Sequence, residues 1–358
     1  MATVSDGANE VVSLLLFGFG LIGVGQMLTR RRHGRPLVSF VIPVRNDAGH
    51  LQECLASIRA DTYPADRVEI VVANNGSTDE TPSVAHSAGA RVLFLPGLRV
   101  AEIRNVAARE ARGEVLAFVD ADHQIGPGWT RSAVESLRMP GVAAVGAPYH
   151  APQDGTWVQR MYDAFRDHRD EPRNVEWLGG GNLAVNRDNF MDVGGFDASL
   201  VTCEDVDLCQ RLRTKGGRIL QEPRMRTTHF GDPETLKALF LGELWRGRDN
   251  LRASLRTPLT WRGLPSVVVP VAQLALMALA LLGLLTAGRG GLSFAGLAML
   301  TLAGVAGLRA AMMLRRMNTV TMKHALQALA VAMVYDVARA LALVYHGTHV
   351  TRQRSAVR

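Results

Sequence analysis

The stretch VLAFVDADHQ (115–124) decides how this chain folds, because five apolar residues end abruptly in two carboxylates. A short apolar run between polar residues predicts a buried strand of a parallel sheet. Asp120 and Asp122 follow it, with only Ala121 between them. On an extended chain both carboxylates face the same side. Two like charges this close repel each other unless a cation lies between them, so the sequence predicts a cation site at the end of this strand.

Three further apolar runs precede this one, and helical segments lie between them. This alternation predicts an α/β domain that binds its ligand at the carboxyl ends of the strands. The predicted strands are Leu37–Val44, Val68–Ala73, Val92–Leu95 and Val115–Val119, and the predicted helices are Gly49–Ala60, Thr81–Ala88 and Val100–Arg112.

Polar clusters end three of these strands: IPVRN (42–46), ANNGSTDET (73–81) and DADH (120–123). In a parallel sheet all three converge on one crevice. The second cluster has the composition of a turn followed by a helix cap, and such a cap also exposes N–H donors to an anion. Mg²⁺ or Mn²⁺ fits the two carboxylates, because hard cations are commonly held by carboxylates together with phosphate oxygens.

The composition predicts a soluble domain joined to membrane segments. Hydrophobic residues make up 47% of the 358 residues and mean hydropathy is +0.07, although 20% of the residues are charged. The net charge of +7 comes without a long basic block that alternates with aromatic residues, so we expect no nucleic-acid partner. Three cysteines without metal-ligand spacing indicate a reducing compartment.

Several uncharged runs are long enough to cross a bilayer. Residues 11–28 are followed by Arg30, Arg31, Arg32 and Arg35. Because positive charge is enriched on the cytoplasmic side of membrane helices, this predicts a signal-anchor helix with the following domain in the cytoplasm. We therefore predict a multi-pass protein of the cell (inner) membrane with a cytoplasmic catalytic domain. The predicted segments are a tail (1–10), a transmembrane helix (11–28), the α/β domain (36–232), an amphipathic helix (233–258), transmembrane helices (264–287 and 290–314), a transmembrane or interfacial helix (325–345) and a basic tail (346–358).

Two of these segments carry open alternatives. Residues 233–258 have the composition of a helix on an anionic membrane surface, and a helix packed on the domain fits the pattern as well. In 325–345, Asp336 and Arg339 have the i,i+3 spacing of a helical ion pair, either inside a membrane or on an interfacial helix.

An ordered series of motifs resembles the family 2 glycosyltransferases with the GT-A fold, over residues 38–230. The resemblance implies a nucleotide-diphosphate-sugar transferase with a Rossmann-like mixed sheet, transfer with inversion at the anomeric carbon, and a divalent cation. The motifs are VIPVRN (41–46), VVANNGSTDET (71–81), RN (104–105), FVDAD (118–122), GGGNLAVNR (179–187), VGGFD (193–197) and EDVDLCQRL (204–212).

The resemblance also implies roles for single residues. Asn74 stands where such enzymes commonly have an Asp that bonds the base, and because a carboxamide can both accept and donate, the base stays open. Arg104 would lie near the base or phosphates, and Asp120 and Asp122 would bind the metal and diphosphate, with His229 as a possible further ligand. The other implied residues are Pro43, Val44, Arg45, Asn46 and Ser77 for the nucleotide, and Gly179, Gly180, Gly181 and Asn182 as the floor under the sugar.

The motif EDVDL (204–208) opens a predicted helix, where acidic residues are also favoured by the helix dipole. The resemblance makes Asp205 the general base that takes the acceptor's proton, with Glu204 as the second choice. Processive synthases of this family usually carry Gln-x-x-Arg-Trp after the domain. This chain has ELWRG (243–247) there, which favours a single transfer.

The sequence therefore predicts a membrane-anchored, metal-dependent glycosyltransferase that moves a sugar from a nucleotide-sugar donor to a lipid-linked or cell-envelope glycan acceptor. A non-catalytic membrane scaffold that binds nucleotide sugars is the alternative, and its support is Asn74. A nucleotidyltransferase is a third possibility, against which the EDVDL and GGFD elements count.

Overall fold

The computed structural model describes residues 34–256, 261, 263–286, 288–317 and 319–345. The predicted transmembrane helix 11–28, the tail before it and the basic tail 346–358 lie outside the described residues.

An eight-stranded mixed sheet forms the centre of the domain, in the order β3-β2-β1-β4-β8-β6-β9-β7. β1 pairs in parallel with β2 and β4, and β8 runs antiparallel between β4 and β6. The α/β fold class with a mixed sheet is confirmed. The strands are β1 (Val38–Val44), β2 (Val68–Asn74), β3 (Arg91–Phe94), β4 (Val115–Val119), β6 (Val142–Gly146), β7 (Arg173–Val175), β8 (Asn182–Asn186) and β9 (Arg218–Gln221).

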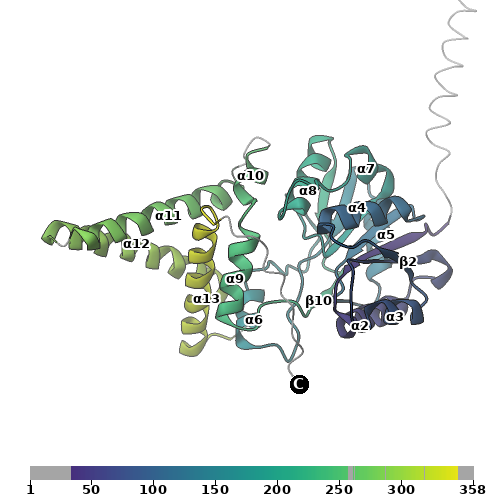
Figure 1. Ribbon diagram of the computed structural model, residues 1–358, viewed down its shortest axis with the longest axis horizontal. Coiled ribbons are helices and arrows are strands. Elements are labelled where there is room, and N and C mark those ends of the chain that lie inside the picture. The colour runs from purple at the N-terminus through teal and green to yellow at the C-terminus, as the bar shows by residue number, and fades with distance from the viewer. Residues whose placement is uncertain (1–33, 257–260, 262, 287, 318, 346–358) are drawn as a thin grey trace, which may run out of the picture. The chain divides into compact units, whose positions relative to one another are not determined.

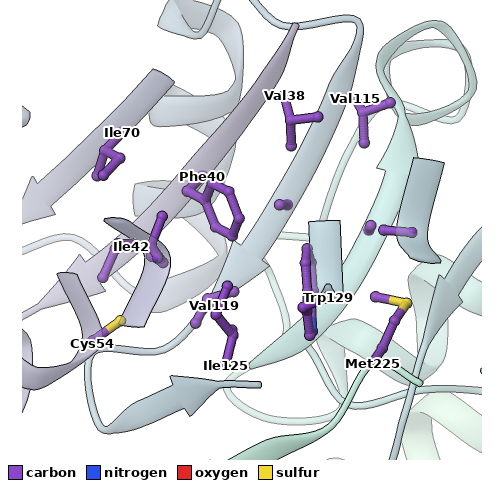
Figure 2. Close-up of a cluster of buried hydrophobic side chains, with 14 of the residues drawn as sticks. Val38, Phe40, Ile42, Cys54, Ile70, Val115, Val119, Ile125, Trp129 and Met225 are labelled. Carbon is purple, nitrogen blue, oxygen red and sulfur yellow. The ribbon is translucent and has the colours of Figure 1, made fainter. Parts of the chain in front are cut away.

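Helices cover both faces of this sheet because its central strands are apolar on both sides. On one face α2 (Ala48–Arg59), α3 (Thr81–Ser87) and α5 (Trp129–Leu137) pack against side chains such as Phe40 and Ile42 (Figure 2). On the other face α4 (Val100–Glu110), α7 (Arg187–Asp192) and α8 (Glu204–Thr214) pack against Phe118. A short 3₁₀ turn, η1 (Ala65–Arg67), precedes β2.

A second, two-stranded sheet lies directly after β4. β5 (His123–Ile125) pairs antiparallel with β10 (Thr227–His229), and the register places His123 opposite His229. This pairing brings a residue from the end of the domain to the end of β4.

Asn182 links several of these elements inside the core. Its side chain is fully buried; its oxygen accepts a hydrogen bond from Trp129 Nε1 at 2.7 Å. Its amide nitrogen donates to the carbonyls of Ala147 at 2.9 Å and Met225 at 3.1 Å. A buried amide with this many partners fixes the relative positions of α5, β8 and the loops after β6 and β9.

The C-terminal part consists of helices that continue the chain beyond β10. Helices α11 and α12 have the length and apolar composition of membrane-spanning helices, and they lie side by side, with the Gly283 backbone close to Gly291 and Ala295 (Figure 1). The helices are α9 (Leu236–Arg246), α10 (Asn250–Ser254), α11 (Leu264–Leu285), α12 (Arg289–Leu314) and α13 (Met322–Leu341), and α6 (Trp157–Asp163) from the domain joins them.

Two details of this part differ from the sequence expectations. The amphipathic segment is broken into α9 and α10, and Leu239 of α9 packs among α6, α12 and α13, so α9 is a packed helix. Asp336 does not pair with Arg339. Instead Arg309 of α12 donates to Asp336 at 2.8 Å, and Arg339 lies 3.8 Å from Glu243. These are contacts between helices, which i,i+3 spacing along one helix cannot reveal.

We predict that Asn182→Ala lowers the free energy of unfolding by roughly 3 kcal/mol, because it leaves a buried indole N–H and two buried carbonyls without their partner. Denaturant unfolding of the purified protein, followed by tryptophan fluorescence, measures the change. Asn174→Ala, at an exposed position of β7, is the control and should stay within about 0.5 kcal/mol of the parent. Equal stability of the two variants would contradict the role given to Asn182.

Candidate active site

A cleft of about 2130 Å³ opens at the carboxyl ends of β1, β2 and β4. Arg45, Arg104, Asp120, Asp122 and Asp205 line it on the side of the domain. It continues as far as α9, α12 and α13, where residues such as Arg246, Arg309 and Arg339 also line it. The expected convergence of the strand ends on one crevice is therefore present.

Arg104 occupies the centre of the cleft wall. Its side chain is buried, donates to Asp120 Oδ1 at 2.5 Å and to Glu204 Oε1 at 2.8 Å, and lies over the ring of Phe196 at 5.5 Å. Burial opposes its charge, but Asp120 and Glu204 hold the pKa of the guanidinium above its ordinary value. The predicted place of Arg104 near donor phosphates remains a prediction, and the structure adds that two carboxylates already hold its position.

The two aspartates of the DxD motif do not lie on one extended segment. The amide of His123 donates to the carbonyl of Asp120 at 3.1 Å, which closes a turn over residues 120–123. As a result Asp120 faces Arg104, whereas Asp122 faces His123 and His229. The expected same-side geometry is corrected in this respect, because a turn rotates the second carboxylate away from the first.

Asp122, His123 and His229 form a group suited to a cation. Each offers one ligand atom, and these atoms lie within 4.8 Å of one another. His123 Nδ1 lies 3.1 Å from Asp122 Oδ1, and His229 Nε2 lies 3.5 Å from Asp122 Oδ2. Nε2 of His123 is buried without a hydrogen-bond partner among the described residues, although buried polar atoms usually have one. The residues therefore fit a divalent cation. Asp120, predicted as a ligand as well, is not part of this group.

The charges around Asp122 favour its ionised form. Burial opposes that form, but His229 and His123 hold the pKa of Asp122 well below its usual range. Burial likewise opposes the charge of His229, while Asp122 and Asp232 raise the pKa of this imidazole to about 9. Asp232 accepts from His229 Nδ1 at 2.8 Å and is itself held by Arg166 at 2.7 and 2.6 Å.

Across the cleft, Asp205 and Glu204 begin helix α8. Asp205 Oδ2 accepts from the amide of Gly180 at 3.0 Å, and Oδ1 accepts from the amide of Val206 at 2.8 Å. Burial raises the pKa of Asp205, and burial together with the charge of Asp205 raises the pKa of Glu204 to about 7. A raised pKa is the property that a carboxylate base needs near neutral pH.

Gly179, Gly180 and Gly181 line the cleft, where an added Cβ would be crowded, and their place under the sugar remains a prediction. A Cβ on Gly180 would lie 3.0 Å from Arg104 Nη1, and one on Gly181 would lie 2.6 Å from Asp120 Oδ2. A Cβ on Gly179 would collide with the hydroxyl of Tyr149. The prediction that Asn182 also contacts the sugar is wrong in position, because its buried side chain is committed to three bonds inside the core.

The predicted nucleotide-binding residues fall into two sets. Pro43, Val44 and Arg45 line the cleft. The other set, Asn46, Asn74 and Ser77, connects the loops that follow β1 and β2. Asn46 has a left-handed backbone (φ 50°); its Oδ1 accepts from the Thr78 amide at 2.8 Å, and its own amide donates to Ser77 Oγ at 2.9 Å. Asn74 Oδ1 accepts from the Ser77 amide at 2.9 Å.

Asn74 is buried, and its neighbour Asn75 lines the cleft instead. The side chain of Asn75 is engaged within the protein as well: its Oδ1 accepts from the Gly97 amide at 2.8 Å, and its Nδ2 donates to the Leu98 carbonyl at 3.1 Å. Two successive Asn residues at a strand end are equivalent in the sequence, and the exact end of the strand decides which one lines the cleft. The expected contact of Asn74 with the base does not agree with its buried position.

Four other residues of the site were not predicted from the sequence. His123 follows the aspartates directly, and this position is a signal that could have identified it. Tyr149, Arg166 and Asp232 lie in segments without a recognised motif, and they reach the site through tertiary contacts.

Comparison with known proteins agrees with this geometry. Residues 39–194 match the family model "Glycosyl transferase family 2". The glycosyltransferase AglE of Haloferax volcanii is 32% identical over 193 residues, which are 51% of this chain and 62% of that protein. The pre-mycofactocin glycosyltransferase of Mycobacterium tuberculosis is 28% identical over 54% of this chain and 42% of its own length. The chain thus matches less than two thirds of either relative.

A solved structure with the same fold is a mannosyltransferase from Pyrobaculum calidifontis in complex with GDP-Man and Mn²⁺. It superposes with a TM-score of 0.54 over 92% of this chain and 97% of that chain, at 19% sequence identity. At this level of identity the likeness concerns the fold.

We predict that Gly231→Ala weakens Mn²⁺ binding about 10–100-fold, because the added Cβ collides with Asp122 Oδ2 and approaches His229 Nε2 to 2.7 Å. Titration of the protein with Mn²⁺, followed by electron paramagnetic resonance, measures the affinity. Gly49→Ala on α2, where nothing lies within 4 Å of the new Cβ, serves as the control. Unchanged Mn²⁺ affinity in Gly231→Ala would show that the ion binds elsewhere.

Proposed function

We propose that this chain is a metal-dependent, inverting glycosyltransferase. The proposal starts from the place of residues 39–194 in glycosyltransferase family 2. The enzyme's donor is a nucleotide sugar and its acceptor is lipid-linked or a cell-envelope glycan. The observation that carries this proposal is the arrangement of the cleft. A group suited to a cation at the end of β4 and a partly buried carboxylate with a raised pKa at the start of α8 line one cavity, with glycines between them.

The donor's diphosphate would lie at the first of these two places. Asp122, His123 and His229 would hold Mg²⁺ or Mn²⁺, which when bound stabilises the negative charge of the leaving diphosphate. Asp232 and Arg166 orient His229, and thereby keep the ligand atoms in position. Arg45, which lines the cleft beside the strand ends, would contact the nucleoside.

Proton transfer would take place at Asp205. As the acceptor oxygen attacks the anomeric carbon, its O–H proton passes to the Asp205 carboxylate, and the bond from that carbon to the diphosphate oxygen breaks. One displacement inverts the anomeric configuration and releases a nucleoside diphosphate. The amides of Gly180 and Val206 hold the two oxygens of Asp205, so the base is oriented before the acceptor arrives.

The acceptor's surroundings support a lipid-linked substrate. The cleft extends from the catalytic carboxylates to helices that pack with the apolar pair α11 and α12, and Arg246, Arg309 and Arg339 line this extension. Guanidinium groups suit the phosphates that join a sugar to a lipid. A multi-pass location in the inner membrane, with the cleft on the cytoplasmic side, completes this proposal.

A single, non-processive transfer also belongs to the proposal. In the ELWRG segment Glu243 is buried, accepts from Tyr162 Oη at 2.6 Å and pairs with Arg246 at 2.9 Å. These two residues connect α9 to α6, so the segment has a structural role. The support for the non-catalytic scaffold is Asn74, and this residue is buried with its Oδ1 bonded to the Ser77 amide, so it does not distinguish the two hypotheses.

We predict that Asp205→Asn lowers turnover about 10²–10⁴-fold, because the amide cannot take the acceptor's proton. Mn²⁺-dependent donor binding should persist in this variant, and Asp122→Ala should lose that binding. A panel of UDP, GDP and dTDP sugars, tested by thermal shift and then with membrane lipid extracts as acceptors, measures both effects. Asp192→Asn, exposed on the far end of α7, is the control. Full activity in Asp205→Asn and Asp122→Ala would refute the mechanism.

We predict that kcat/KM falls on the acid side with an apparent pKa above the ordinary carboxyl range and toward 7. The base must be ionised, burial raises the pKa of Asp205, and burial together with the charge of Asp205 raises the pKa of Glu204 to about 7. Glu204→Gln removes a like charge, so the acid limb of the pH profile should move to lower pH. A pH series of initial rates for the parent and the variant measures this. If the acid limb stays at the same pH, the charge of Glu204 does not affect the pKa of the base.

A further inference from the structure

A second cluster of metal-ligating side chains lies outside the cleft's lining, around the end of α6. His150, Asp163 and His168 each offer one ligand atom, and these atoms lie within 4.8 Å of one another. His168 Nε2 is 3.1 Å from Asp163 Oδ1, and the rings of His150 and His168 are stacked with centroids 4.1 Å apart. All three side chains are partly exposed, so an ion can reach them from solvent.

The chemistry of this cluster differs from that of a simple ion pair. Two stacked imidazoles repel each other when both are protonated. Two imidazole nitrogens and one carboxylate oxygen are the protein ligands of zinc sites that keep a fourth position open.

We propose that His150, Asp163 and His168 bind a transition-metal ion of the zinc class, at a site separate from Asp122, His123 and His229. Two imidazoles and one carboxylate suit zinc and its neighbours in the first transition row. The ion would join the segment after β6 to the end of α6 and the residues that follow it.

The position of this site connects it to the active site by two routes. Asp163 Oδ1 accepts from Arg166 Nη1 at 3.1 Å, and Arg166 holds Asp232, which accepts from His229. In addition the amide of His229 donates to the carbonyl of His150 at 2.9 Å. The three ligands are thus positioning residues, and the ion fixes both ends of the network that orients His229.

The test measures zinc in the full-length, detergent-solubilised protein after a chelator has removed bound metal and Zn²⁺ has been returned by dialysis. We expect His168→Ala and His150→Ala to lose one zinc ion per chain relative to the parent. His86→Ala, at an exposed position of α3, should keep the parent's content, and Asp122→Asn should keep the ion at the second site. With Co²⁺ in place of zinc, the visible absorption of histidine-bound ions should decrease in the same two alanine variants, and the part that comes from His123 and His229 should remain.

Zinc content in His168→Ala and His150→Ala equal to that of the parent would overturn the proposal, and so would loss of all zinc in Asp122→Asn. If an alanine variant does not fold, His168→Gln decides, because the amide keeps a hydrogen bond to Asp163 and is a poor zinc ligand. Since the readout is metal content, its outcome is independent of whether the proposed sugar transfer is found.

Discussion

The buried guanidinium of Arg104 holds the two halves of the site together. It comes from α4 and joins Asp120, at the end of β4, to Glu204, at the start of α8. Without it the buried carboxylate of Glu204 and the partly exposed carboxylate of Asp120 would lack their shared countercharge, and an unpaired buried charge is strongly destabilising. Arg104 also approaches the backbone of Gly180 closely, which explains why residue 180 has no side chain. Arg104 therefore sets both the charge balance and the shape of this part of the cleft.

On either side of Arg104 the surroundings shift the pKa values of the carboxylates in opposite directions. Imidazoles lower the pKa of Asp122, whereas burial raises the pKa of Asp205 and Glu204. Groups that differ in this way can take different parts in one reaction. An anion that binds a cation must stay ionised, and a base must be able to hold a proton. The two environments arise from the ends of different elements, β4 and α8, which the sheet brings to one cleft.

The sequence could predict most of this frame, and the missed features share a physical cause. Apolar runs located β1, β2, β3 and β4 because burial on both faces leaves a clear pattern. The insertion of β8 between β4 and β6, the turn at residues 120–123 and the burial of Asn74 depend on local geometry that composition does not record. Asn182 was misjudged because a glycine-rich motif suggests a ligand, although this amide serves the core.

The contacts of Glu243 carry this reasoning to the C-terminal helices. Its carboxylate is buried and meets Tyr162 of α6, Arg246 of α9 and Arg339 of α13, so the catalytic domain and the helical part share one polar junction. A buried charge is retained only where its partners are in place, and α13 can therefore not move away from α6 without exposing or unpairing it. Because the same junction lines the cleft, the helices that follow the domain form part of the wall of the site as well as being candidates for the membrane anchor.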